Sequence, residues 1–412
     1  MKDSGISWVG EIPKEWSVWR NKYIFKITKD IVLPSKNYQL LSLTTTGIKE
    51  KDENDNGGKV PENYDGYQIV KENDLVMCLF DLDCSAVFSG LSPYNGMISP
   101  AYKVLKVKKR IANEQYYRYW FNYVGSKRFY KQYSKSLRFT LNADEFNRLF
   151  SLLPPLDEQQ RIAEFLDREC GKIDGLKADI QAQIDTLEQY KRSVITEAVT
   201  HGLNPSAPMK DSGIPWVGQF PTHWTKKKGK YILRYMSKPV KQDDGVITCF
   251  RDGEVTLRSN RREDGFTMAD KEIGYQGVDV GDLVVHGMDG FAGAIGISDS
   301  RGKASPVLNV LNTKQNKKYI MYYLRSMAYG EVFTALSTGI RVRSCDLRWN
   351  KLAELLYPLP PIDEQNNIVN YIDEQIARTN EIIADKKSQI ETLDGYKKSL
   401  IYEYVTGKKE VE

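Results

Sequence analysis

The chain has 412 residues, of which 41% are hydrophobic and 27% charged, a composition typical of two or three packed domains. Its formal net charge of +5 permits a polyanionic partner without requiring one. There is no stretch of eighteen apolar residues and no signal-peptide pattern at the first residues, so we expect a cytoplasmic protein that does not enter a membrane.

The cysteines argue against a structural zinc site. The five thiols are odd in number and scattered, without the close pairs that structural zinc requires. We therefore expect reduced, unpaired thiols and no metal site.

An internal duplication organises the chain. Residues 1–16 and 209–224 are identical at 11 of 16 positions, and residues 183–200 and 389–406 are identical at 11 of 18. The sequences between these matching ends agree much less. The chain therefore consists of two halves that meet near residue 208. Their divergent middles have the pattern expected of two domains that recognise different targets on a common scaffold.

The middle of the first half, residues 17–150, has mixed strand and helix patterns. Residues 40–44 are predicted to form a strand and residues 114–121 a helix. Residues 126–139 hold five basic residues and no acid, beside several aromatics. Such a segment can bind phosphates and present arginine to bases. The candidate DNA contacts of this half are Arg20, Lys22, Arg128, Lys131, Lys135 and Arg138.

Residues 151–208 are predicted to form a spacer helix and a linker. Two prolines and two acids precede an apolar stripe, as at a helix start. Gly171 and Gly175 predict an interruption. Beyond them, apolar residues recur at spacings of three and four, which predicts an amphipathic helix of about 28 residues, roughly 42 Å long.

The second half repeats this order. After the repeat segment, residues 225–356 contain a predicted strand at 282–285 and a predicted helix at 318–329, and residues 357–412 form the second spacer helix. Basic residues again gather in the middle. The candidate DNA contacts of this half are Lys227, Arg251, Arg258, Arg261, Arg262, Arg341 and Arg343.

The duplication predicts an α+β fold with a pseudo-two-fold relation between its halves. Two equivalent helices related by such an axis pack antiparallel and are self-complementary. We therefore expect two mixed α/β domains separated by two long antiparallel helices. The alternative is that both helices are ordinary core helices of separate domains.

The sequence shows no catalytic centre. Residues 296–304 resemble a phosphate-binding loop, but they contain one residue too many and carry Ala304 where a magnesium-binding hydroxyl belongs. The three histidines lie far apart, and no nucleophile motif accompanies them. For the basic clusters a solvated surface is the alternative interpretation, but their recurrence in both halves favours nucleic acid.

Two motifs occur once in each half and together carry a family resemblance. Each half begins Gly-Ile-x-Trp-Val-Gly and ends Leu-Pro-Pro-(Leu/Ile)-Asp-Glu-Gln before a long helix. This arrangement resembles the specificity subunits of type I restriction-modification systems over the entire chain. The residues that match the first motif are Gly5, Ile6, Trp8, Gly10, Pro13 and Trp16, with Gly213, Ile214, Trp216, Gly218, Pro221 and Trp224.

The resemblance implies a non-catalytic, sequence-specific DNA-binding subunit that reads a split, asymmetric site. Its implied partners are double-stranded DNA, two modification (methyltransferase) subunits and restriction subunits. S-adenosylmethionine, ATP and magnesium would then be bound by those partner subunits, with no cofactor in this chain. The implied organisation is two repeat segments (1–16 and 209–224), two target-recognition domains (17–150 and 225–356), a central spacer helix with linker (151–208) and a distal spacer helix (357–412).

Two alternatives remain open at this stage. One is a reader fused to its own methyltransferase or nuclease activity, against which the missing catalytic motifs argue. The other is a helical assembly protein that does not bind DNA.

Overall fold

The chain folds into two compact units. Unit 1 comprises Met1–Ile180 and Ser388–Glu412, and unit 2 comprises Gln181–Lys387, so each unit takes helix segments from both halves of the sequence. The computed structural model describes residues 1–32, 38–51, 64–261, 273–336 and 347–411.

Unit 1 combines short antiparallel strands with short helices. Its helices are α1 (Asn21–Ile24), α2 (Glu114–Ser126), the 3-10 helix η1 (Phe129–Tyr133) and α3 (Ala143–Arg148). Its strands are β1 (Lys2–Asp3), β2 (Glu11–Ile12), β3 (Ser17–Arg20), β4 (Phe25–Thr28), β5 (Leu41–Thr44), β6 (Gly47–Glu50), β7 (Gln68–Val70), β8 (Leu75–Met77), β9 (Ser89–Leu91), β10 (Gly96–Ile98), β11 (Lys103–Val107) and β12 (Phe150–Leu153).

Unit 2 has the corresponding set. Its helices are η2 (Gly229–Tyr231), η3 (Arg258–Asn260), η4 (Gly290–Ala292), α5 (Lys317–Tyr329), α6 (Val332–Ala335) and α7 (Trp349–Glu354). Its strands are β13 (Met209–Asp211), β14 (Gln219–Pro221), β15 (Thr225–Lys228), β16 (Leu233–Tyr235), β17 (Ile247–Cys249), β18 (Val255–Leu257), β19 (Gln276–Val278), β20 (Leu283–His286), β21 (Ile295–Ile297), β22 (Gly302–Ala304), β23 (Leu308–Thr313) and β24 (Leu356–Leu359).

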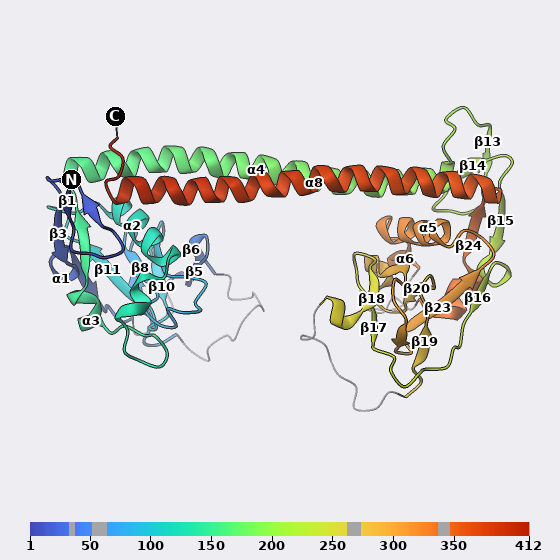
Figure 1. Ribbon diagram of the computed structural model, residues 1–412, viewed down its shortest axis with the longest axis horizontal. Coiled ribbons are helices and arrows are strands. Elements are labelled where there is room, and N and C mark those ends of the chain that lie inside the picture. Colours follow the sequence, from blue (N-terminus) through green and yellow to red (C-terminus); the bar gives the residue numbers. More distant parts are fainter. Residues whose placement is uncertain (33–37, 52–63, 262–272, 337–346, 412) are drawn as a thin grey trace. The chain divides into compact units, whose positions relative to one another are not determined.

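The two units share one sheet topology. Unit 1 has a four-stranded sheet in the order β4-β11-β8-β9, and unit 2 has β16-β23-β20-β21 in the same order, with antiparallel pairing throughout. Two-stranded ribbons correspond as well, for example β3 with β12 and β15 with β24 (Figure 1). The predicted α+β fold with an internal duplication is confirmed. The duplication also includes the middles, whose sequences diverge.

The helices α2 and α5 anchor each sheet to the long helices. Both begin at an asparagine whose side chain accepts hydrogen bonds from first-turn amides, a favoured N-cap. In unit 1, Tyr116 donates from its hydroxyl to the Val405 carbonyl at 3.0 Å, and in unit 2 Tyr319 makes the same contact to Val199 at 3.1 Å. The sheet domain is therefore attached to the long helices in the same way in both units.

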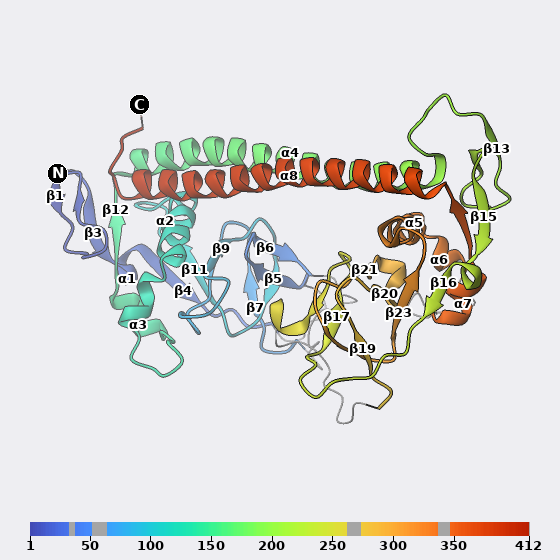
Figure 2. The same ribbon diagram turned by 45° about the vertical axis from the view of Figure 1, so that its right-hand side comes forward.

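Two long helices run through both units. The first, α4, spans Leu156–His201, and the second, α8, spans Ile362–Val405. Figures 1 and 2 show them side by side.

The pairing of α4 with α8 is antiparallel in both units. In unit 1, Asp174 and Lys177 of α4 contact Lys397 and Asp394 of α8, so the numbers rise on one helix as they fall on the other. In unit 2, Gln183 contacts Lys386 and Lys191 contacts Asn380, which gives the same direction. The predicted antiparallel pair is confirmed.

The interruption predicted at Gly171 and Gly175 is wrong, because α4 is one continuous helix of 46 residues. A Cβ added at either glycine would meet no atom within 4 Å, so both lie on the open side of the helix. Each glycine costs a helix about 1 kcal/mol relative to alanine. Packing of the apolar stripe against α8 offsets this cost, as for most helices in proteins.

The repeated Asp-Ser-Gly sequence forms a backbone turn. The carboxylate of Asp3 accepts a hydrogen bond from the Gly5 amide at 3.0 Å, and Asp211 makes the same contact with Gly213 at 2.9 Å. Gly5 and Gly213 have φ angles of +71° and +61°, in the left-handed region that glycine adopts without strain. This part of the motif therefore serves the fold.

The tryptophans and acids of the two motifs contact one another within each unit. Trp16 donates from its indole nitrogen to Glu158 at 2.8 Å, and Trp224 donates to Glu364 at 3.0 Å. Both tryptophans are fully buried. The repeat segment is thereby fixed to the first turn of a long helix, which explains why both motifs occur in each half.

The glutamine that ends the second motif is a buried connector. Gln159 and Gln365 are fully buried, and each accepts a hydrogen bond from a backbone amide, that of Asn113 at 2.9 Å and of Asn316 at 3.0 Å. The Gln159 side-chain nitrogen also donates to two carbonyl oxygens, at 2.9 Å each. One side chain therefore satisfies three backbone groups, two of them just before α2 and one just before α4.

Substitution of Gln159 by leucine is expected to lower the free energy of unfolding by roughly 3 kcal/mol or more. Each buried backbone group left without a partner costs about 1–3 kcal/mol. The loss is measured by urea unfolding of the full chain. The matched control is Gln160→Leu at the exposed neighbouring position, which should change stability by less than about 0.5 kcal/mol. Equal stability of the two variants would contradict the connector role.

Candidate nucleic-acid interface

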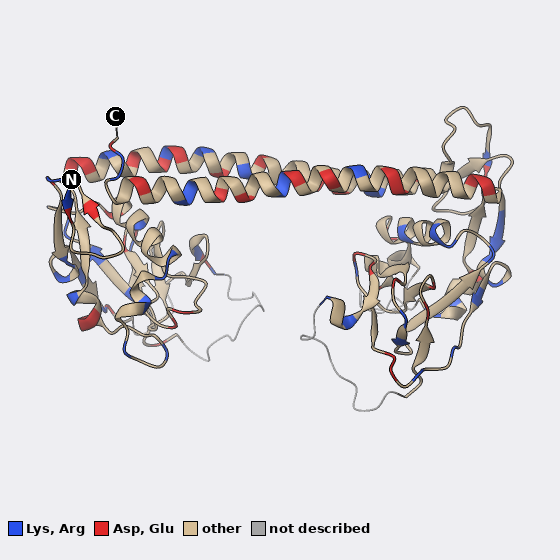
Figure 3. Ribbon diagram, in the orientation of Figure 1, with Lys and Arg blue, Asp and Glu red and all other residues tan. Residues whose placement is uncertain are grey.

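A hollow of about 1120 Å³ lies in unit 2 where β17, η3 and the end of β20 meet. Its lining includes Arg251, Arg258 and Arg261, three of the residues predicted to contact DNA. Figure 3 shows basic residues at η3, beside the loop after β17. The structure therefore gathers three predicted contacts around one concave surface.

Carboxylates hold two of these guanidinium groups in place. Arg251 pairs with Asp289 at 3.0 Å, and Arg261 pairs with Asp252 at 2.5 Å. The Arg261 guanidinium also lies over the Phe250 ring, 4.2 Å from its centroid. An arginine restrained in this way loses little conformational entropy when it binds, and its remaining donors suit the paired acceptors of guanine or of a phosphate.

The ion pair between Arg261 and Asp252 keeps both charges over a wide pH range. Burial raises the pKa of Asp252, but hydrogen bonds from Arg261 and the Glu254 amide, together with the charges of Arg261 and Arg325, outweigh burial, so the net pKa lies below its usual range. The same contact raises the pKa of Arg261. Arg258 is held differently, because its Nε donates to the Thr248 hydroxyl at 3.4 Å.

His286 adds a neutral donor to the hollow. Burial lowers its pKa, which leaves the ring uncharged at neutral pH. Its Nδ1 accepts hydrogen bonds from the amides of Met288 and Asp289, at 3.2 and 2.9 Å, so the proton of the neutral ring lies on Nε2. Burial raises the pKa of the nearby Cys249 thiol to about 12, so this thiol stays protonated at neutral pH.

The predicted residues of unit 1 form a separate exposed segment around η1. Arg128 precedes η1 with a φ of +53°, and Lys131 lies with its ammonium 4.5 Å from the centroid of the Phe139 ring. Arg138 pairs with Asp81 at 3.4 Å, with its side chain 81% exposed. Lys135 is also exposed in this segment.

Arg20, Lys22 and Lys227 lie elsewhere in their units. The Arg20 guanidinium is 5.6 Å from the centroid of the Phe150 ring, and the Lys22 ammonium is 4.7 Å from that of Tyr23. Lys227 is exposed on β15. None of these three residues is in the lining of the hollow. Arg262, Arg341 and Arg343 lie outside the described residues.

Neighbours of Lys227 are already paired within the protein. Lys228 and Lys230 both contact Glu354, at 2.7 and 2.8 Å. These contacts lower the pKa of Glu354 to about 2. The basic run on β15 therefore offers less free charge than its sequence indicates.

The sequence did not indicate Phe250, His286 or Asp289 as part of this site. His286 and Asp289 lie at the end of β20 and in the loop after it, and only the fold brings them to Arg251 and Arg261. An aromatic residue directly before Arg251 was the one local signal.

Two further surveys cover the part of the chain that the structure describes. Within it, no group of three or more histidine, cysteine, aspartate and glutamate side chains is placed to hold a metal ion. None of the described helices combines the length and the apolar character needed to span a membrane. The described cysteines, Cys78, Cys84, Cys170 and Cys249, form no disulfide.

Comparison with known proteins gives full-length matches. A relative from Methanocaldococcus jannaschii, which carries the provisional name type I restriction enzyme MjaX specificity subunit, is 22% identical over 442 residues, covering 98% of this chain and 96% of the relative. The predicted resemblance to type I specificity subunits is confirmed. No family model matches the chain.

Comparison with solved structures shows a shared fold. A chain solved for the structural basis underlying complex assembly and conformational transition of the type I R-M system superposes with a TM-score of 0.67 at 13% identity, covering 97% of this chain and all of that chain. The HsdS subunit from Thermoanaerobacter tengcongensis has a TM-score of 0.49 at 14% identity, over 97% of this chain and 98% of that one. The first match shows that the fold is shared.

Proposed function

We propose that this chain is the specificity subunit of a type I restriction-modification complex and reads a split, asymmetric DNA site. In this proposal it acts in the cytoplasm and carries no catalytic activity. Two methyltransferase subunits, with restriction subunits, bind it and hold S-adenosylmethionine, ATP and magnesium. The similarity to a specificity subunit over 98% of the chain supports this role.

One observation carries the proposal of a split site. The two units repeat the same strand order, yet they carry different basic side chains on that framework. In unit 2 the arginines surround a hollow, whereas in unit 1 the basic residues lie on the segment around η1. Two copies of one framework with different contact residues are suited to read two different sequences.

The attachment of these units favours a scaffold role for α4 and α8. Buried hydrogen bonds from Tyr116 and Tyr319 fix the sheet domain of each unit to one of the long helices, α8 in unit 1 and α4 in unit 2. Both helices carry acidic and basic residues along their length, as Figure 3 shows. We infer that α4 and α8 hold the two sheet domains in the complex with the partner subunits.

Replacement of Arg251, Arg258 and Arg261 by glutamine is expected to weaken DNA binding by the assembled complex. A bidentate base contact contributes about 1–3 kcal/mol of discrimination, so its loss should relax the choice of base at one position. Loss of a phosphate contact should instead weaken binding evenly and flatten the salt slope by about one unit. The measurement is a mobility shift of the complex at graded salt, with single and triple variants.

Arg378→Gln is the matched control, since it removes one positive charge from the exposed surface of α8, away from the hollow. It should keep the affinity and the salt slope of the parent chain. Unchanged binding by the triple variant would remove the hollow from the DNA surface. If the parent complex itself gives no shift, the chain serves assembly without DNA binding.

A further inference from the structure

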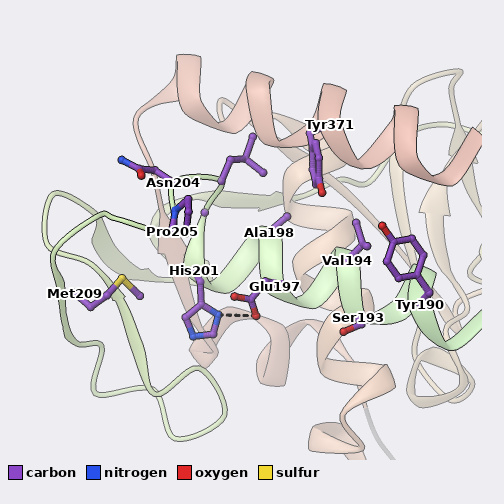
Figure 4. Close-up of a pocket in the computed structure, with 12 residues that line it drawn as sticks. Tyr190, Ser193, Val194, Glu197, Ala198, His201, Asn204, Pro205, Met209 and Tyr371 are labelled. Carbon is purple, nitrogen blue, oxygen red and sulfur yellow. Dashed lines mark ion pairs between the residues drawn. The ribbon is translucent and has the colours of Figure 1, made fainter. Parts of the chain in front are cut away.

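A second hollow, of about 670 Å³, lies in unit 2 at the end of α4 (Figure 4). In Figure 4, Tyr371 projects from α8 toward the part of α4 that carries Val194 and Ala198. The Tyr371 side chain is 37% exposed although it faces this apolar surface. The loop after α4 and Met209 complete the wall.

The equivalent place in unit 1 is filled by the chain itself. The repeat relates Phe165 to Tyr371 and Tyr404 to Ala198, with an offset of 206 for both pairs. Phe165 and Tyr404 pack with ring centroids 4.3 Å apart. Unit 2 keeps one aromatic ring of this pair and has a methyl group in place of the other.

The charged residues at the rim of the hollow also differ between the two units. In unit 1, Glu403 pairs with Lys409 at 2.8 Å, and its side chain is 28% exposed. In unit 2 the side chain of the equivalent Glu197 is 71% exposed, and the ion-pair partner found for it among the described residues is a histidine, His201, at 3.3 Å. An imidazole pairs with a carboxylate as a cation only when it is protonated. Unit 2 thus lacks both the aromatic ring and the permanent positive charge that unit 1 supplies internally.

We propose that a partner protein supplies both groups, by placing an aromatic side chain in the hollow and a lysine or arginine beside Glu197. The contacts inside unit 1 define this chemistry, because Tyr404 and Lys409 occupy the equivalent positions there. The proposal rests on the proposed function in taking the partner to be a methyltransferase subunit. It follows that the two methyltransferase subunits of one complex make different contacts with the two units.

The test is a substitution in α4 that fills the hollow with an aromatic side chain of the chain itself. Ala198→Tyr recreates the residue that unit 1 carries, and the control Gln189→Tyr adds the same side chain at an exposed position of α4 outside the hollow. The full chain is titrated with the purified methyltransferase subunit of its own system, and the bound number is read by native mass spectrometry. We expect Ala198→Tyr to bind one of the two subunits at least tenfold more weakly, while the control keeps both.

A second measurement uses p-cresol, the tyrosine side chain as a free molecule, followed by saturation-transfer NMR with the chain alone. The parent chain and the control should bind it, and Ala198→Tyr should not. Should Ala198→Tyr fail to fold, Tyr371→Ala removes the other wall of the hollow and is expected to cause the same losses.

Three outcomes distinguish failure of the proposed contact in the hollow from failure of the proposed function. Unchanged binding of both subunits by Ala198→Tyr overturns the proposal, as does p-cresol binding that does not distinguish this variant from the control. A parent chain that binds p-cresol but no methyltransferase subunit shows that the proposed function is wrong, while the preference of the hollow for an aromatic ring stands.

Discussion

Exchange of residues 17–150 for the corresponding domain of another type I specificity subunit is expected to change one half of the methylated DNA site and to leave the other half unchanged. These residues lie wholly within unit 1. Strand β3 at the start of the graft pairs with β12 through backbone hydrogen bonds, which any side chains permit. Methylome sequencing of a host that expresses the chimera with its partner subunits gives the site directly.

The reciprocal exchange of residues 225–356 is the matched control and should change only the other half-site. A change in both half-sites, or in neither, would contradict one reader per unit. The same hosts also test for catalysis in this chain. Expressed without its partners, the chain should leave the genome unmethylated, and methylation in that strain would establish the reader-enzyme alternative.

Lengthening both long helices by four residues is expected to widen the gap between the two half-sites by one or two base pairs. Four residues add about 6 Å to a helix and nearly preserve the phase of its apolar stripe, and one base pair spans about 3.4 Å. Because Gln183 of α4 contacts Lys386 of the antiparallel α8, the two insertions belong after Gln183 and before Lys386, which keeps this contact intact. Both half-site sequences should stay as they were in the methylome.

Insertion after Gln183 alone is the control for this experiment. It shifts the apolar stripe of α4 by a turn relative to an unchanged α8, so we expect a less stable chain and weaker methylation. An unchanged gap in a double-insertion variant that still methylates would show that the partner subunits set the spacing.

The sequence predicted the strands and helices that are indicated by a local hydrophobic pattern. The expected strands and helices of both middles are present, because alternation and helical periodicity reflect burial on one face. The common topology of the middles was not predicted, since it depends on few identical residues. Asp74 and Asp282 are two of them, and each accepts a hydrogen bond from a backbone amide three residues earlier, at 2.9 and 2.8 Å.

The candidate DNA site was predicted only through its charges. Clustering in the sequence indicated Arg251, Arg258 and Arg261, and the fold places all three on one hollow. The ion pairs that hold them were not predictable, because Asp289 is 38 residues from Arg251 in the chain. The aromatic hollow at Ala198 was missed for a different reason, since a small residue in a helical stripe has the pattern of ordinary core.

The composition of the units has a consequence for synthesis on the ribosome. Unit 1 contains the first residues of the chain, yet its core includes Leu400, Ile401 and Val405 of α8. Unit 2 ends at Lys387 and can therefore complete its core first. After Ile180, more than 200 residues remain to be synthesised. At about 5–20 residues per second this takes roughly 10–50 s, during which the apolar face of the first domain stays exposed to solvent. The N-terminal unit is thus the last to fold, and a chain released before residue 388 leaves that unit without its second helix.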